Sequence, residues 1–372
     1  MNSPEKIPFN DLSRAPKEIR DEINAAIAKV IASGWYVMGP EHAAFEQELA
    51  DFVDAREAVL LGNGTDALEL ALAAVGVANG DGVVTVANAG GYTTVAARLL
   101  GARLEYSDVD PISLQMTAAT FGETLKRLGT KPKAVVVTHL FGTMAPVEQI
   151  AGIARGQGIA VVEDCAQALG ARDGGKAAGT FGDIATTSFY PTKNLGALGD
   201  GGAVFTNNSE LADSVRKMRQ YGWGTKYRIV HDHGRNSRMD ELQAAILRVK
   251  LPHLDSYNER RRHIHERYEQ AGSMNLRVVG TASESSISHL AVLASTDRDE
   301  VRAKFTEWGI GTDVHYPVPD HLQQFPSRPP ERLSLPATEQ AAKTIFSVPI
   351  FPELTDSEVD RICVVIQHIG GQ

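Results

Sequence analysis

The sequence predicts an α/β protein with a mainly parallel central sheet flanked by helices, plus a smaller C-terminal α+β domain. Short apolar runs alternate with helical patterns from residue 58 to residue 163, and such βαβα order is typical of a parallel sheet covered on both faces. Near Met239 the pattern changes to one long charged helix. The 372 residues with 43% hydrophobic content suffice for two cores. We expect a large domain over residues 1–245 and a smaller one over 246–372.

Two helices precede the alternating part. Apolar residues recur at helical spacing from Ala15 to Ala32, where Ser33 and Gly34 end the pattern, and a second stripe runs from Glu41 to Ala55. The alternating part then predicts, in order, strand 58–61, helix 65–75, strand 82–86, helix 93–100, strand 104–109, strand 134–139, helix 147–154 and strand 159–163. Two further buried strands are expected in "ATTSFYP" and "GDGGAVFT", on either side of Lys193.

The last third of the chain has a different sequence pattern. The stretch from Met239 predicts a long linker helix that is bent or broken at Pro252. Beyond it, "HLAVLA", "GIGTDVHYPV" and a helix over 356–369 indicate the smaller domain. The proline-rich "FPSRPPERLSLPAT" is expected to be an exposed loop.

Composition restricts the function classes. The formal net charge is −9, so no global basic field favours nucleic acid or an anionic membrane, and an anionic substrate needs a local site. The two cysteines, Cys165 and Cys363, are too few for a disulfide framework and too sparsely placed for a zinc site; Cys165 is expected to be a packed small residue. Because the N-terminus lacks an export pattern and no eighteen apolar residues follow one another, we expect a cytoplasmic protein.

The run "GNGTDALELALAAVGV" follows a strand and opens a helix. Gly64, Thr65 and Asp66 therefore lie at a helix N-terminus, where free backbone N–H groups favour a phosphate. The alternative is that Thr65 or Asp66 is an ordinary N-cap.

Asp164 ends a buried strand at the sheet edge where ligands bind. A buried carboxylate is costly unless it meets a cation or good donors, and a protonated pyridine nitrogen would satisfy it. The alternative is that Asp164 caps the following turn.

Lys193 lies downstream of Asp164, among small residues, aromatics and glycines, with Ser188 five residues before it. A lysine for a covalent imine, a carboxylate for the ring nitrogen and a phosphate cup are the set that pyridoxal 5'-phosphate (PLP) requires. The order of the residues therefore predicts PLP as cofactor, with Lys193 and Asp164 as catalytic residues.

With these residues in place, the chain resembles the DegT/DnrJ/EryC1/StrS family of fold-type-I, PLP-dependent nucleotide-sugar aminotransferases, from about Ile7 to the C-terminus. The stretches that carry the resemblance are "GNGTDAL", "DVDP", "EDCAQALGA", "SFYPTKNLGALGDGGA", "GRNSRMDELQAAIL" and "HYPVPDHLQ". The resemblance implies these cofactor contacts: Lys193 at the imine, Asp164 at the ring nitrogen, Gln167 near the ring hydroxyl, and Ser188, Gly64 and Thr65 at the phosphate. It also implies that Asn236 reaches the phosphate of the neighbouring subunit, hence a homodimer with shared active sites; its alternative role is to cap the helix near Met239.

The resemblance also implies a substrate site. "QYGWGTKY" is similar to members that aminate a dTDP-linked keto sugar at C3, in which a tyrosine and a lysine, here Tyr221 and Lys226, approach the nucleotide sugar. His315, Tyr316 and His321 belong to a shared motif and line the sugar site or form a merely structural turn. Arg238 braces the loop or contacts the substrate.

The implied reaction is transfer of an amino group from L-glutamate to the keto carbon of a dTDP-linked keto-6-deoxysugar at C3. The alternatives are a 4-aminotransferase for a UDP- or GDP-keto sugar and a non-catalytic regulatory homologue. Sugar 3-dehydration, for which the family replaces the lysine by histidine, is disfavoured by Lys193.

One stretch departs from the family pattern. Members usually carry an aromatic after the strand, stacked on the cofactor ring, whereas "TVANAGGYTTVAARLLGA" has Gly90 at that position and Tyr92 two places later. Either Tyr92 stacks on the cofactor or the ring packs differently.

Two histidine pairs could suggest metal. The pairs "HDH" (His231, His233) and "HIH" (His263, His265) lack a third ligand at useful spacing and lie in polar stretches. We expect solvated faces and no metal site.

Overall fold

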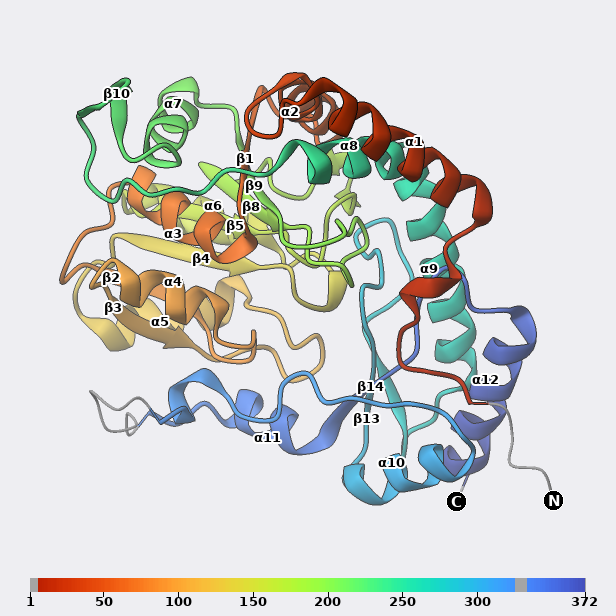
Figure 1. Ribbon diagram of the computed structural model, residues 1–372. Helices are drawn as coiled ribbons and strands as arrows, with labels where there is room; N and C mark the ends of the chain where they lie inside the picture. Colours follow the sequence, from red (N-terminus) through yellow and green to blue (C-terminus); the bar gives the residue numbers. More distant parts are fainter. Residues whose placement is uncertain (1–5, 325–332, 372) are drawn as a thin grey trace.

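The computed structural model describes residues 6–324 and 333–371. Its centre is a seven-stranded sheet of order β1-β9-β8-β5-β4-β2-β3 (Figure 1). Neighbouring strands pair in parallel except around β9, which is antiparallel to both β1 and β8. The mainly parallel sheet predicted from the alternating pattern is therefore confirmed. The central strands are β1 (Glu57–Leu61), β2 (Gly82–Val86), β3 (Arg103–Ser107), β4 (Ala134–Thr138), β5 (Ala160–Asp164), β8 (Ile184–Ser188) and β9 (Gly202–Thr206).

Helices cover both faces of this sheet. In β4, Val135 and Val137 face one core while Ala134 and Val136 face the other, as the two-residue period of a strand requires. The first face is packed by α2 (Pro40–Phe52), α5 (Ala118–Leu128), α6 (Val147–Gly156) and α8 (Glu241–Lys250). The second is packed by α3 (Gly64–Ala74), α4 (Tyr92–Leu99) and α7 (Ser209–Met218). Helix α1 (Lys17–Ser33) packs on α8 through Ile19, Ile23 and Ile246.

The linker helix is broken where the sequence predicts. Helix α8 ends at Lys250, a 3-10 turn spans Leu251–His253, and α9 (Leu254–Ala271) continues. Pro252 lies in that turn. Its ring removes the N–H that a continuous helix needs, so the helix breaks there. One long element thus leads from the large sheet to the C-terminal elements (Figure 1).

The C-terminal elements have a core of their own. An antiparallel sheet of β12 (Arg277–Val279), β13 (Ala291–Ala294) and β14 (Ile345–Val348) packs with α9, α10 (Arg298–Glu307) and α12 (Asp356–Gly370). Ile7, near the N-terminus, joins this core. Helix α11 (Pro336–Thr344) instead contacts the segment that follows β3, where Asp108 accepts hydrogen bonds from Ala337 N and Thr338 N. Two short antiparallel pairs complete the fold: β6 (Arg172–Asp173) with β7 (Lys176–Ala177), and β10 (Trp223–Thr225) with β11 (Arg228–Ile229).

Two stretches of the C-terminal part depart from what the sequence suggests. The stretch "GIGTDVHYPV" forms only single bridges, from Ile310 to Ile7 and from Asp313 to Ser347. The end of the proline-rich stretch is helical from Pro336, which suits proline at a first helical turn, while residues 325–332 lie outside the described residues.

None of the helices in the described ranges is long and apolar enough to cross a membrane.

Candidate active site

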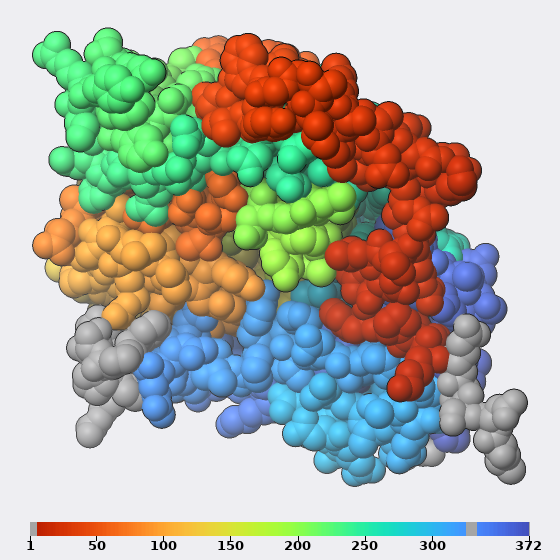
Figure 2. Space-filling model, viewed as in Figure 1, coloured from red at the N-terminus to blue at the C-terminus, as the bar shows by residue number. Residues whose placement is uncertain are grey.

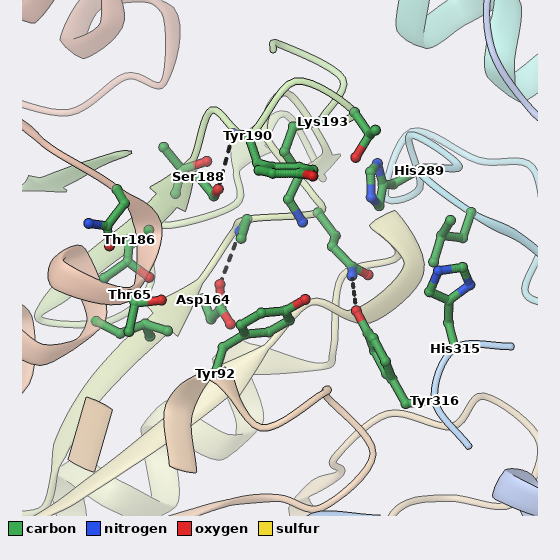
Figure 3. Close-up of a pocket in the computed structure, with 18 of the residues that line it drawn as sticks. Thr65, Tyr92, Asp164, Thr186, Ser188, Tyr190, Lys193, His289, His315 and Tyr316 are labelled. Atoms are coloured by element: carbon green, nitrogen blue, oxygen red, sulfur yellow. Dashed lines mark hydrogen bonds between the residues drawn. The ribbon is translucent and has the colours of Figure 1, made fainter. Parts of the chain in front are cut away.

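A cavity of about 540 Å³ opens at the carboxyl ends of β5 and β8, where ligands collect in parallel sheets (Figure 3). Its volume falls within the usual range of ligand pockets. Of the residues singled out in the sequence, it is lined by Gly64, Thr65, Tyr92, Asp164, Gln167, Ser188, Lys193, His315 and Tyr316. The lining does not include these residues, which were also predicted to contact the cofactor or the substrate: Tyr221, Lys226, Asn236 and His321.

One end of the cavity is the N-terminus of α3. The side chain of Asn63 accepts from Asp66 N at 2.8 Å, so Asn63 is the N-cap, and the alternative of a Thr65 or Asp66 cap is wrong. The N–H groups of Gly64 and Thr65 precede the first intrahelical bonds and are left for an anion. A Cβ atom on Gly64 would lie 2.7 Å from Ser188 Cβ. Glycine therefore lets the helix terminus and the Ser188 side chain meet at one point of the cavity.

Asp164 is the last residue of β5 and is 6% exposed. Its Oδ1 accepts from Ala166 N at 3.1 Å, so the turn contact weighed as the alternative is present on one oxygen. Burial nevertheless raises the pKa of Asp164, against that hydrogen bond and the Lys193 charge. The carboxylate is thus buried with less stabilisation than its charge needs.

Lys193 lies in the loop between β8 and β9, and its backbone N–H donates to Tyr190 O at 2.8 Å. Burial lowers the pKa of Lys193 to about 8, although Asp164 acts in the opposite direction. A lysine with this pKa has an appreciable fraction of free amine near neutral pH, which is the nucleophilic form.

The wall opposite Lys193 is aromatic. Gln167 accepts from Phe141 N at 2.6 Å and donates to the Tyr316 hydroxyl at 3.1 Å. A Cβ atom on Gly90 would lie 2.8 Å from the Tyr316 ring, so Tyr316 fills the space of a side chain at that position. Tyr92 starts α4, lines the cavity and meets Tyr316 edge to face at 6.3 Å. Tyr92 as the stacking ring stays a prediction.

His315 lines the cavity, whereas His321 does not. The His315 ring stacks on Phe9 at 5.6 Å, and its Nδ1 lies 3.0 Å from Ser347 Oγ. Burial lowers the pKa of His315. The buried His321 ring instead pairs with Glu339 at 3.3 Å, away from the cavity.

The segment with Asn236 lies beside α3 without lining the cavity. Arg235 forms ion pairs with Asp66 and Glu69, and Ser237 accepts from Gly62 N. Asn236 itself is exposed and accepts from Arg238 Nε at 2.7 Å. Arg238 therefore braces the loop, and Asn236 does not cap α8, which begins at Glu241.

Tyr221 and Lys226 lie in the exposed region around the β10–β11 hairpin. Tyr221 packs against Trp223 at 4.9 Å and lies under the Arg238 guanidinium. Lys226 lies over the Tyr227 ring at 5.2 Å. Within one chain neither reaches the cavity, so their proposed contact with substrate requires a second subunit or movement of the hairpin.

The structure adds cavity residues that sequence reasoning missed, chiefly Tyr190, Thr192 and His289. Tyr190 and Thr192 flank Lys193 in "SFYPTKN", so their proximity to the lysine was a usable signal. His289 is distant from Lys193 in the sequence, and no pattern around it indicated that it lies in the cavity.

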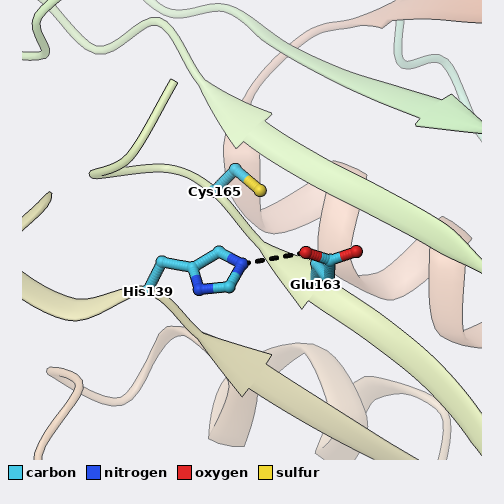
Figure 4. Close-up of side chains that lie close together, drawn as sticks. All are labelled: His139, Glu163 and Cys165. Carbon is cyan, nitrogen blue, oxygen red and sulfur yellow. Dashed lines mark hydrogen bonds and ion pairs between the residues drawn. The ribbon is translucent and has the colours of Figure 1, made fainter. Parts of the chain in front are cut away.

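His139, Glu163 and Cys165 form a buried cluster with potential metal ligands within 4.8 Å of one another (Figure 4). Their polar groups are already engaged. His139 Nδ1 accepts from Ala145 N, so its Nε2 donates to Glu163 at 2.9 Å. Glu163 also accepts from the backbone amides of residues 179, 181 and 182, and burial raises the pKa of the Cys165 thiol well above its ordinary value. This cluster is therefore structural.

His265 corrects another expectation, because it is buried in the C-terminal core rather than solvated. Burial lowers its pKa to about 4. Its neighbour in the "HIH" pair, His263, is exposed as predicted.

Comparison with known proteins gives full-length matches. The chain is 38% identical to the pleiotropic regulatory protein of Geobacillus stearothermophilus, over 98% of this chain and 100% of that protein. It is 37% identical to a dTDP-3-amino-3,4,6-trideoxy-alpha-D-glucose transaminase of Streptomyces venezuelae, over 98% and 96% of the two chains.

Solved structures also match nearly the full length of the chain. The structure of S. venezuelae DesV in complex with a ketimine intermediate matches with a TM-score of 0.92 and 36% identity, covering 99% of each chain. NtdA from Bacillus subtilis with bound cofactor PMP matches with a TM-score of 0.91 and 30% identity, covering 99% of this chain and 86% of that one. The sequence profile of one family matches residues 17–367. The chain belongs to the DegT/DnrJ/EryC1/StrS aminotransferase family.

Proposed function

We propose that this protein is a PLP-dependent aminotransferase that moves an amino group from L-glutamate to the keto carbon of a dTDP-linked keto-6-deoxysugar at C3. The observation that carries the proposal is one cavity that joins a half-buried lysine with a pKa of about 8, a buried carboxylate with a raised pKa and an open helix N-terminus. These groups fit an aldehyde, a protonated ring nitrogen and a phosphate. The PMP in the NtdA structure supports the same cofactor.

Each residue has a distinct task. Gly64 N–H, Thr65 N–H and Ser188 would hold the phosphate, and the Asp164 carboxylate would keep a proton on the ring nitrogen. When bound, the protonated ring supplies an electron sink for the breaking of a C–H bond next to nitrogen. Lys193 would hold the cofactor covalently and, once released, move the proton between the amino-acid carbon and the cofactor as general base.

The substrate assignment rests on relatives and local charge. The S. venezuelae transaminase is named for a dTDP-linked 3-amino sugar. Lys226 would supply a positive charge for the diphosphate in a protein whose net charge is −9. The test incubates the enzyme, L-glutamate and a panel of dTDP-, UDP- and GDP-linked 3-keto and 4-keto sugars, and identifies products by mass and NMR. Amination only of a 4-keto or a UDP- or GDP-linked sugar would overturn the assignment.

A regulatory role is the second candidate, because the Geobacillus relative is named a regulatory protein. The complete set of Lys193, Asp164 and Ser188 in one cavity favours turnover. The two roles differ when glutamate is added to PLP-loaded protein. An aminotransferase loses the visible absorbance of the lysine-bound cofactor, whereas a sensor without turnover keeps it.

We further propose a homodimer in which Asn236 of one subunit serves the phosphate site of the other. Asn236 is exposed and does not line its own cavity. Large apolar side chains are exposed on three segments: Trp35 and Tyr36 after α1, Tyr190 and Leu198 around the lysine loop, and Tyr227 and Ile229 on the hairpin. Exposed apolar surface of this kind is typical of an interface. In Figure 2 the light-green lysine loop reaches the surface between the red N-terminal and blue C-terminal segments.

Subunit mixing tests the shared site. Lys193→Ala and Asn236→Ala subunits are combined under conditions that allow exchange. If the site is shared, a mixed dimer holds one site with both defects and one with neither, so activity rises above that of either parent variant. No recovery despite demonstrated exchange, with both variants impaired, would place Asn236 in its own subunit's site.

A further inference from the structure

His289 is a cavity residue to which the proposed reaction assigns no task. It lies just before β13, is 7% exposed and lines the cavity that contains Lys193. Figure 3 shows its ring on the Lys193 side of the cavity. Its Nδ1 is 2.8 Å from Oδ1 of Asn194, the residue that directly follows the lysine.

The hydrogen bonds around Asn194 determine which ring nitrogen carries the proton. Asn194 Nδ2 lies within hydrogen-bond distance of Ile287 O, at 3.3 Å, and of Asn258 Oδ1, at 2.7 Å. A backbone carbonyl can only accept, so the amide nitrogen of Asn194 must face it and Oδ1 must face His289. Asn258 is oriented in the same way, since its Nδ2 donates to Leu169 O.

It follows that His289 Nδ1 carries a hydrogen and donates it to Asn194. In a neutral ring Nε2 is then an unprotonated acceptor. The ring is neutral because burial, and next the Lys193 charge, hold the pKa of His289 well below its ordinary value. Within residues 6–324 and 333–371, neither Nε2 nor Lys193 Nζ makes a hydrogen bond, and both residues line one cavity.

We propose that His289 is a positioning residue whose Nε2 accepts a hydrogen bond from the free amine of Lys193. An acceptor on one N–H leaves the nitrogen lone pair directed elsewhere, which orients the amine for attack and for proton transfer. The Asn258–Asn194–His289 chain, in which Asn258 and His289 are buried and Asn194 is half-buried, holds this acceptor in one tautomer. The inference rests on the proposed function only in taking Lys193 as the reacting amine.

Histidine ¹⁵N NMR tests the contact without turnover. The protein is loaded with pyridoxamine phosphate, which leaves Lys193 as a free amine, and His289 is assigned by loss of its signals in His289→Phe. We expect the Nδ1–H tautomer from pH 6.5 to 8.5 and an Nε2 signal that moves in Lys193→Met. An Nε2–H tautomer, or an Nε2 signal identical in parent and Lys193→Met, would overturn the proposal. If the protein does not bind this cofactor, the proposed function fails, and the same comparison on the cofactor-free chain still tests the contact.

A kinetic series provides a second readout, the rate at which cofactor-free protein captures PLP on Lys193. Loss of one hydrogen bond is expected to slow capture about tenfold in His289→Phe. His289→Gln offers an amide donor to Asn194 and a carbonyl acceptor to Lys193, so its rate is expected within about threefold of the parent. His265→Phe, a buried histidine outside the cavity, is the matched control and should also stay within about threefold. If His289→Phe folds and captures PLP at the parent rate, the proposal is contradicted.

Discussion

Two adjacent carboxylates on β5, Glu163 and Asp164, point to opposite sides of the strand and differ in how well their charges are stabilised. Burial alone would raise the pKa of both. For Glu163 the His139 hydrogen bond and the backbone amides outweigh burial, and its pKa is lowered. For Asp164 burial outweighs one backbone amide and the Lys193 charge, and its pKa is raised.

This difference distinguishes Glu163, which has a structural role, from Asp164, which is suited to bind a ligand. Every strong interaction of Glu163 comes from within the chain, so its charge helps to hold the segment around residues 179–182 against the sheet. Asp164 faces a cavity and is not fully compensated. A positively charged ring nitrogen would supply the missing interaction. The functional carboxylate of this strand is therefore Asp164, whose charge the protein stabilises less well than that of Glu163.

The largest expected effect is that of Lys193→Ala. We expect no measurable transamination, because no other amine lines the cavity among the described residues and the covalent attachment is lost. Lys193→Arg should be equally inactive, since a guanidinium does not form an imine. Steady-state rates and circular dichroism check this prediction, with unchanged secondary structure as the control. Activity comparable to the parent would remove Lys193 from the chemistry.

Asp164→Asn should come next, with a loss on the order of a hundredfold or more in kcat. An amide cannot keep the ring nitrogen protonated, but the helix terminus and Lys193 remain to bind the cofactor. Cofactor content is measured by absorbance beside the rate. A variant within about threefold of the parent would show that Asp164 only makes its turn contact.

Glu163→Gln is the matched change on the other side of the strand. We expect a loss of about 2–4 kcal/mol in the free energy of unfolding, since backbone donors that now face a carboxylate would face an amide instead. The urea midpoint reports this loss. The rate per folded molecule should stay within about threefold of the parent. An unchanged midpoint with a lower rate would reverse the roles of the two carboxylates.

The smallest effect is in the pH dependence of stability, measured on cofactor-free protein. The lowered pKa of Glu163 means that its contribution is present above its ordinary value of 4.5 and is lost as pH falls below that value. The deficit of Glu163→Gln should therefore narrow in acid. The raised pKa of Asp164 has the opposite sign, so Asp164→Asn should gain stability relative to the parent as pH rises above 3.8. If the stabilities of the two variants, each relative to the parent, changed with pH in the same way, the proposed difference between Glu163 and Asp164 would be contradicted.

The sequence predicted the sheet because buried strands and amphipathic helices alternate with different periods, and it predicted the break at Pro252 from backbone chemistry. It did not indicate α7 or α10. Helix α10 is mostly charged and buries only Val301 and Phe305, whereas Ala212, Val215 and Met218 of α7 lie at helical spacing and were a usable signal. Strands β12 and β14 were also missed, because each is specified by pairing with β13.

At the site, Asp164, Ser188 and Gly64 could be predicted together because each lies at the carboxyl end of a strand or directly after one. His289 could not, since a long-range contact with Asn194 places it in the cavity. The exposure of Asn236 and Lys226 was equally invisible to local patterns, as it depends on how the hairpin packs.

The protonation state of the cofactor ring tests the central claim most directly. PLP labelled with ¹⁵N in the ring is bound to the parent, to Asp164→Asn and to Glu163→Gln, and the ring nitrogen shift is recorded by NMR at pH 7.5. We predict a protonated nitrogen in the parent and in Glu163→Gln and an unprotonated one in Asp164→Asn. An unprotonated nitrogen in the parent, or a protonated one in Asp164→Asn, would contradict the assignment of Asp164 as the carboxylate that holds the ring proton.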